Sequence, residues 1–179
     1  MAVPIPTSVT TANLTGTYTL NAKLSDSSQS VLKMQNISWV VRQAVAYSTV
    51  TITLKQYTND KGVVKLDQDQ VSTGGTRNRE ERVLDGEWRE SENKIWGKVK
   101  GRTRWVKLAD VEDDYLKQGW DSTDGDFIES LVESATDTWT ALQLYGFAEV
   151  EGARRHVRKV VAKKGNTVER IRLIYDWKG

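Results

Sequence analysis

The first 57 residues contain the pattern that most limits what this chain can fold into. Residues 14–20 (LTGTYTL) and 47–57 (YSTVTITLKQY) alternate apolar and polar side chains with a period of two, which is typical of strands with one buried face. From Ser28 onward the apolar residues recur at close to helical spacing, and Asn36 favours a break because short polar residues prefer caps and turns. The stretch therefore predicts the order strand, helix, helix, strand.

Two segments within this order carry a family resemblance. Residues 16–20 (GTYTL) and 37–45 (ISWVVRQAV) resemble the fatty-acid-binding-protein and lipocalin (calycin) superfamily. In that superfamily a G-T-W/Y-x-L strand opens a barrel, and in the intracellular branch a helix-turn-helix with a G-V-x-x-x-x-R-K-like segment covers one end. Here Asn36-Ile37 stands at the Gly-Val position and Arg42-Gln43 at the Arg-Lys position. The resemblance implies an all-β fold, a single antiparallel lipocalin-like β-barrel with a helical lid at 28–46 and a small-molecule cavity.

The rest of the chain predicts eight to ten strands in total. Alternation continues through residues 63–70 and 94–108, and Gly165-Asn166 fits the two-residue type II′ turn of a C-terminal hairpin. Residues 110–118 and 127–133 are predicted as two short helices, an insertion at 110–134 that the intracellular branch lacks and that suggests a second lid. We expect one barrel domain over residues 14–179, preceded by a flexible N-terminal arm over residues 1–13.

Composition excludes several classes of function. The chain has 26 basic and 24 acidic residues, a net charge of +2, so no global field attracts nucleic acid. It has no cysteine, which rules out disulfides and thiolate catalysis and suits a reducing compartment. No apolar run approaches the ~20 residues of a membrane helix. We therefore expect a cytoplasmic protein with no nucleic-acid partner and no membrane span; a homodimer is left open.

Aromatic residues and inward amides predict the lining of the cavity. Seven tryptophans and six tyrosines stand against two phenylalanines, and such amphipathic rings suit pockets in which one ring edge needs a polar partner. Gln68 and Gln70 share the inward face of their strand, where they contact either a ligand or ordered water. The predicted substrate-binding residues are Tyr18, Trp39, Gln68, Gln70, Trp105 and Trp139.

The C-terminal hairpin predicts the catalytic residues. A turn at Gly165-Asn166 places His156 opposite Tyr175 and Arg158 opposite Leu173, with all four side chains facing inward. A histidine titrates near neutral pH, so His156 is the predicted general acid–base, with Tyr175 and Arg158 stabilising a developing oxyanion. A haem held by His156, as in haem-binding barrels of the superfamily, is an alternative. No dinucleotide fingerprint or metal-ligand spacing is present, so no cofactor is expected.

Two classes of function fit these features. The chain looks like the lipocalin-type proteins of fungal natural-product clusters, which implies binding of a hydrophobic small molecule and its cofactor-independent cyclisation or isomerisation in secondary-metabolite biosynthesis. The alternative is an intracellular fatty-acid or lipid carrier without catalysis. A carrier accepts several lipids and releases them unchanged, whereas an enzyme converts one substrate.

Overall fold

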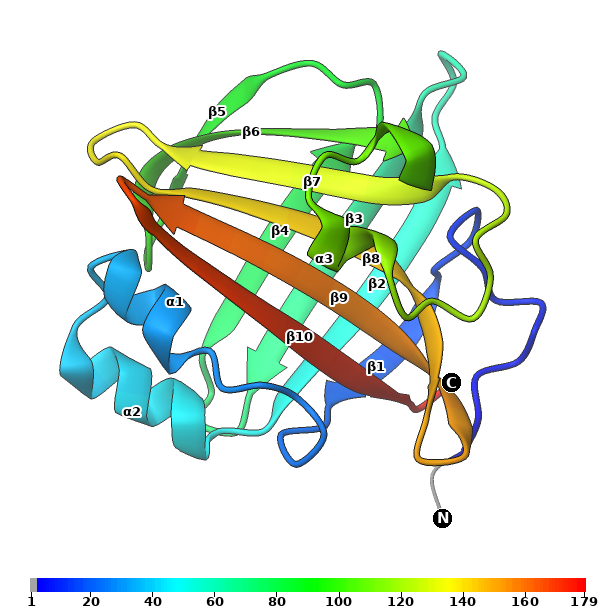
Figure 1. Cartoon of the computed structure of the whole chain (residues 1–179), viewed down its shortest axis with the longest axis horizontal. Coiled ribbons are helices and arrows are strands. Elements are labelled where there is room, and N and C mark those ends of the chain that lie inside the picture. Colours follow the sequence, from blue (N-terminus) through cyan, green and yellow to red (C-terminus); the bar gives the residue numbers. More distant parts are fainter. Residues whose placement is uncertain (1–2) are drawn as a thin grey trace.

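A computed structural model describes residues 3–179 and shows one antiparallel sheet rolled into a barrel (Figure 1). The sheet has ten strands in the order β4-β3-β2-β1-β10-β9-β8-β7-β6-β5. Their bounds are β1 (Gly16–Leu20), β2 (Val50–Thr58), β3 (Val64–Ser72), β4 (Arg77–Val83), β5 (Arg89–Asn93), β6 (Gly97–Val106), β7 (Phe127–Ser134), β8 (Thr140–Val150), β9 (Ala153–Lys164) and β10 (Thr167–Trp177). The predicted barrel is confirmed.

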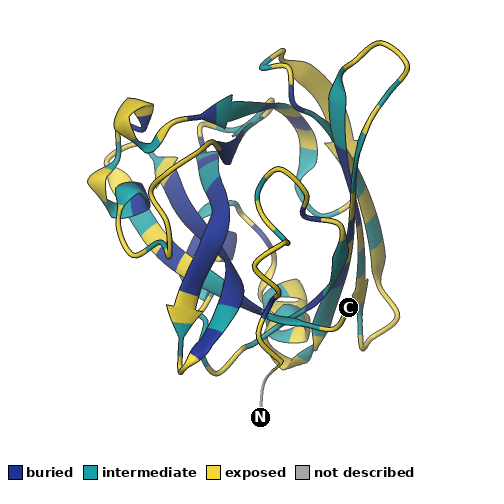
Figure 2. Ribbon diagram, turned by 90° about the vertical axis from the view of Figure 1, so that its right-hand side faces the viewer, coloured by how far each residue is buried: buried dark blue, intermediate teal, exposed yellow. Residues whose placement is uncertain are grey.

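The seam of the barrel lies between β4 and β5, which are not paired with each other. At one end of this seam Leu84, just after β4, forms an isolated parallel bridge with Thr103 of β6, and the Gly86 amide donates to the Thr103 carbonyl at 2.9 Å. Buried residues are concentrated in β7, β8 and β9, whereas β4 and β5 are largely half-buried or exposed (Figure 2). The seam is therefore the least covered side of the barrel.

The predicted helix-turn-helix covers one end of the barrel, at the lower left of Figure 1. It consists of α1 (Gln29–Met34) and α2 (Trp39–Tyr47). Asn36 separates them with a left-handed φ of 61°, which short polar side chains tolerate, and the Ser38 side chain accepts from the Val41 amide to cap α2. Val31 of α1 packs on inward residues of β9 and β10, so α1 anchors the helix pair at this end.

Residues 3–13 of the N-terminal arm pack against the barrel, although the sequence predicted a flexible segment. Ile5 is only 2% exposed and belongs to the main core. Its amide donates to the Arg154 carbonyl at 3.0 Å, and the Arg154 guanidinium donates back to the Pro6 carbonyl at 2.9 Å. The Gln56 side-chain amide holds the carbonyls of residues 11 and 12.

The register of the C-terminal hairpin agrees with the prediction. Tyr175 pairs with His156 and Leu173 pairs with Arg158. Gly165 has a φ of 57°, which a type II′ turn requires at its first central position. Because successive strand residues point to opposite faces, this register places His156, Arg158 and Tyr175 on the inner face.

The predicted helix at 127–133 is wrong, because this segment is strand β7. Over so short a run its apolar residues fit both the helical period of 3.6 and the strand period of two. Pairing with β6 and β8 makes the segment a strand. The rest of the insertion contains a 3-10 turn (Leu108–Asp110) and one helical turn, α3 (Asp114–Lys117).

The insertion covers the outer face of β8 and β9 and is not a lid over a barrel end (Figure 1). Trp120 packs onto Gly146, and Lys159 on β9 donates to the Tyr115 carbonyl at 2.8 Å. Burial lowers the pKa of Lys159, whose ammonium also lies 4.6 Å from the centre of the Tyr115 ring. Within residues 3–179, no helix has the length and apolarity needed to cross a membrane.

Candidate active site

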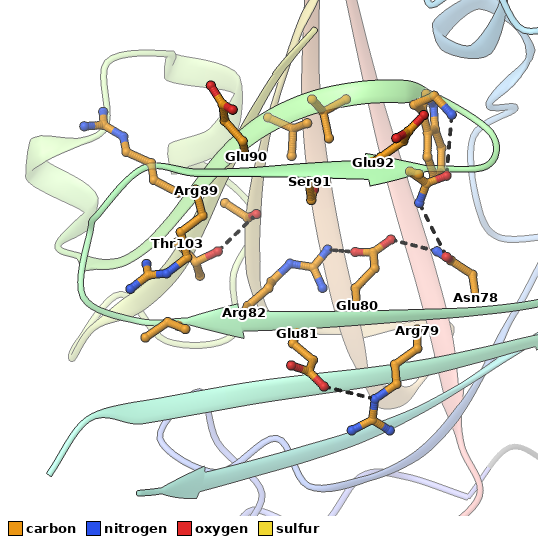
Figure 3. A pocket seen from close by; sticks show the side chains of 18 of the residues that line it. Asn78, Arg79, Glu80, Glu81, Arg82, Arg89, Glu90, Ser91, Glu92 and Thr103 are labelled. Carbon is orange, nitrogen blue, oxygen red and sulfur yellow. Dashed lines mark hydrogen bonds and ion pairs between the residues drawn. The ribbon is translucent and has the colours of Figure 1, made fainter. Parts of the chain in front are cut away.

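A cavity of about 670 Å³ opens at the seam and reaches into the barrel between β4, β5 and β6 (Figure 3). The unpaired edges of β4 and β5 form its mouth, and inward residues of β6, β7 and β8 form its inner wall. A volume of this size is in the range of ordinary small-molecule sites. The two walls differ in chemistry.

One wall is apolar and aromatic. Trp139, which is 3% exposed, packs with Val99 and Ala141, and Trp96 and Val132 extend this cluster. The Trp96 indole N–H donates to the Gln35 side chain at 2.9 Å, which ties the wall to the end of α1. These side chains make this wall of the cavity apolar, which suits the apolar part of a ligand.

The opposite wall is polar and comes from alternate residues of β4. Figure 3 shows Asn78, Glu80 and Arg82 in a row along the strand, facing the gap between β4 and β5. Glu80 is paired with Arg82 on one side and accepts from the Asn78 amide at 3.0 Å on the other. Asn93 of β5 completes the row with a 3.4 Å contact to Asn78.

This polar wall was not predicted from the sequence. Residues 77–82 (RNREER) mix charges of both signs, and such runs are usually solvated. The alternation contained the signal: Asn78, Glu80 and Arg82 fall on one face, and Arg79 pairs with Glu81 on the other.

The predicted catalytic residues do come together inside the barrel. His156 is fully buried, with ring-centroid distances of 5.2 Å to Tyr18 and 5.5 Å to Tyr175. Its Nδ1 donates to the Gly146 carbonyl at 3.0 Å, and its Nε2 accepts from the Arg158 Nε at 3.2 Å. Burial, and then the nearby Arg158 charge, holds the pKa of His156 well below its usual value.

This environment fixes His156 as a neutral imidazole at pH 7. Both ring nitrogens are engaged, which disfavours the proton transfer expected from the sequence and leaves no nitrogen for a haem iron. Instead, the ring orients the guanidinium of Arg158, which lies 4.3 Å from the Tyr145 ring centre and 5.2 Å from that of Tyr175. Burial raises the pKa of Tyr175, so its phenol stays protonated.

The remaining predicted residues fall in different places. Trp139 lines the cavity. Tyr18 and Trp105 face inward but pack in the main core. Trp39 is 65% exposed on α2, so its assignment to the barrel lining is wrong.

The two predicted glutamines lie on the inner face of β3. Gln68 is 3% exposed and pairs in register with Glu80, and Gln70 pairs with Asn78. Neither is among the side chains that line the cavity itself. Among residues 3–179, no group of three or more His, Asp or Glu side chains is arranged to hold a metal ion.

Comparison with solved structures assigns the fold to the fatty-acid-binding-protein type of barrel. The Echinococcus granulosus fatty-acid-binding protein 1 superposes with a TM-score of 0.56 at 12% identity, over 92% of this chain and 97% of that one. The fluorescent protein UnaG gives a TM-score of 0.56 at 14% identity, over 92% and 96%. The expected calycin barrel is thereby confirmed.

Sequence comparison identifies nearer relatives. No protein-family model matches the chain. The probable pericyclase scpY of Mollisia scopiformis is 29% identical over 178 residues, 97% of this chain and 94% of the relative. Pericyclase pydY of Acremonium sp. is 33% identical over 178 residues, 97% of this chain and 96% of the relative. Since the match extends over nearly the whole of both proteins, the chain belongs to the pericyclase family that they represent.

Proposed function

We propose that this chain catalyses a cofactor-independent pericyclic cyclisation of a hydrophobic natural-product precursor inside its barrel. The observation that carries the proposal is the two-walled cavity, with Trp139 and Trp96 on one side and the row of Asn78, Glu80 and Arg82 on the other. Similarity to pericyclase pydY supports the reaction class. The cytoplasm is the proposed location, which the absence of cysteine supports.

A pericyclic reaction suits a site of this kind. Bonds form and break through a cyclic shift of electron pairs within one molecule, so the product is an isomer of the substrate and no oxidant or base is consumed. The protein has to hold a flexible chain in the reactive conformation, and well-oriented intramolecular reactions reach effective molarities of about 10⁵–10⁸ M. Donors aimed at a conjugated carbonyl oxygen lower the barrier further.

Each wall has a part in this mechanism. The indoles of Trp139 and Trp96 provide a flat surface that restricts an extended apolar chain. The polar wall fixes the oxygen-bearing end, which sets which two carbons meet. His156 acts as a positioning residue that orients Arg158 and moves no proton itself.

The test uses the precursor that accumulates when this gene is deleted in the organism that encodes it. Purified protein added to an extract of the deletion strain should convert this precursor into a product of identical mass with a different retention time and weaker polyene absorption. Heat-denatured protein is the control. An unchanged precursor would contradict the proposal.

Two tryptophan variants sharpen the test. Trp139→Ala should lower turnover by on the order of 10²-fold, because a loosened wall lets the chain leave the reactive geometry. Trp39→Ala should leave turnover unchanged, since this indole is exposed on the lid. Equal turnover rates for Trp139→Ala and Trp39→Ala would contradict a reaction in this cavity.

A lipid carrier is the second candidate, favoured by the fatty-acid-binding-protein fold. A carrier would bind the accumulated precursor and release it unchanged, so the same incubation separates the two functions.

A further inference from the structure

Three hydrogen-bond donors on the inner face have no partner among residues 3–179. They are Nη2 of Arg158, Nη1 of Arg82 and the hydroxyl of Tyr145, all fully buried. The side-chain oxygen of Gln68, on the inner face of β3, is also unpaired. Native proteins rarely leave buried polar groups unsatisfied, so such a group needs an explanation.

These donors belong to side chains that are neighbours inside the barrel. The centre of the Tyr145 ring lies 4.3 Å from the Arg158 Cζ and 6.0 Å from the Arg82 Cζ. Tyr145 and Arg158 are direct cross-strand partners on β8 and β9. Arg82 comes from β4 across the barrel, next to the cavity. Donors from three strands therefore surround the Tyr145 ring, and one of them, Arg82, also lines the cavity.

The charges of this cluster do not balance. Its ionised side chains are Arg82, Arg158 and Glu80, which sum to one positive charge. Both carboxylate oxygens of Glu80 are already engaged, by Arg82 and Asn78. Among residues 3–179, the polar and aromatic contacts of the Arg158 guanidinium are with the neutral His156 and two tyrosine rings. A buried guanidinium without a carboxylate partner is costly and calls for a counter-charge.

We propose that Arg158, Arg82 and Tyr145 bind a singly charged oxyanion on the substrate, a carboxylate or an ionised enol conjugated to the chain that cyclises. A single negative charge neutralises the cluster, whereas a phosphate dianion would leave a net negative charge buried. Two guanidiniums and a phenol match the lone pairs of a planar oxygen group. This inference rests on the proposed function, because the anchored end sets how the chain folds against Trp139.

The probes are cis-parinaric acid and its methyl ester, two fluorescent polyenes that differ only in the charge of the head group. The wild-type protein should bind the acid at least about tenfold more tightly than the ester at pH 7.5, as a charge-assisted contact implies. Equal affinity for the two probes, or no binding of the acid, overturns the proposal.

Two variants test the residues. Tyr145→Phe removes a hydroxyl that has no protein partner, so it should weaken acid binding about tenfold without lowering stability or ester binding. Glu80→Gln makes the cluster more positive and should tighten acid binding. Tyr115→Phe, on the outer insertion, is the matched control and should change neither affinity. If neither Tyr145→Phe nor Glu80→Gln changes the affinity for cis-parinaric acid, the proposal is overturned.

The outcome is separable from the proposed function. If the protein prefers the acid but does not cyclise the accumulated precursor, the oxyanion site is supported and the proposed reaction is contradicted. If the protein cyclises the precursor but binds acid and ester equally, the proposed reaction is supported and the oxyanion site is contradicted.

Discussion

Lowering the pH from 7.5 to 5.5 should destabilise the folded protein through one side chain, His156. The ring is fully buried, its Nδ1–H donates to the Gly146 carbonyl, and its Nε2 accepts from the permanently charged Arg158. Protonation would put a second donor against the guanidinium and a charge in the core. The folded state therefore keeps the imidazole neutral well below its usual pKa.

The magnitude follows from proton linkage. In the unfolded chain the histidine pKa is about 6.5, so at pH 5.5 about nine-tenths of the rings are protonated, against almost none in the folded state. The unfolded state binds more protons, so stability rises with pH in this range and falls as the pH drops below 6.5. Between pH 7.5 and 5.5 the loss is RT ln 10, about 1.4 kcal/mol.

Urea unfolding at the two pH values measures this term, with His156→Asn as the comparison. The variant should be less stable at pH 7.5, because it loses ring packing, but it should lack the 1.4 kcal/mol loss at pH 5.5. Surface carboxylates such as Asp85, whose pKa Arg89 lowers to about 2, contribute equally to both proteins. Equal losses in the two proteins would refute the neutral, buried imidazole.

Three further substitutions test the packing. Gly146→Ala should cost about 1–3 kcal/mol by overpacking, since its Cβ would lie 2.7–2.9 Å from two aromatic rings, whereas Gly74→Ala meets nothing and should be neutral in the same urea titration. Ile5→Ala should cost about 2–5 kcal/mol because Ile5 is buried in the main core, and the exposed Val3→Ala almost nothing, both by calorimetry. Tyr18→Phe should cost about 1–3 kcal/mol in urea, because the hydroxyl donates at 2.9 Å to a buried carbonyl that would lose its partner.

The sequence predicted the structure well where periodicity, capping residues and turn residues all indicated the same element. The opening strand, the break at Asn36 and the lid all follow from local periodicity and capping. The hairpin register follows from the turn at Gly165 and the apolar alternation of β10, so the inward placement of His156 was predictable. These are contacts between residues close in sequence.

The failures involve contacts that depend on distant segments. Residues 127–133 fit a helix and a strand equally, and only their neighbours in the sheet select the strand. The charges of β4 look solvated until the barrel closes and turns alternate side chains toward β8 and β9. The neutral state of His156 depends on its complete burial and on the nearby Arg158 charge, and periodicity does not reveal how deeply a side chain is buried.

We propose that this barrel folds a precursor into a ring without moving a proton, and turnover in D₂O tests this mechanism. The precursor accumulated by the deletion strain is incubated with purified protein in D₂O, and the product is analysed by mass spectrometry and NMR. A pericyclic step predicts an isomer with no deuterium at the carbons that form the new bonds. Deuterium at those carbons, or a precursor recovered unchanged, would contradict the proposed pericyclic cyclisation.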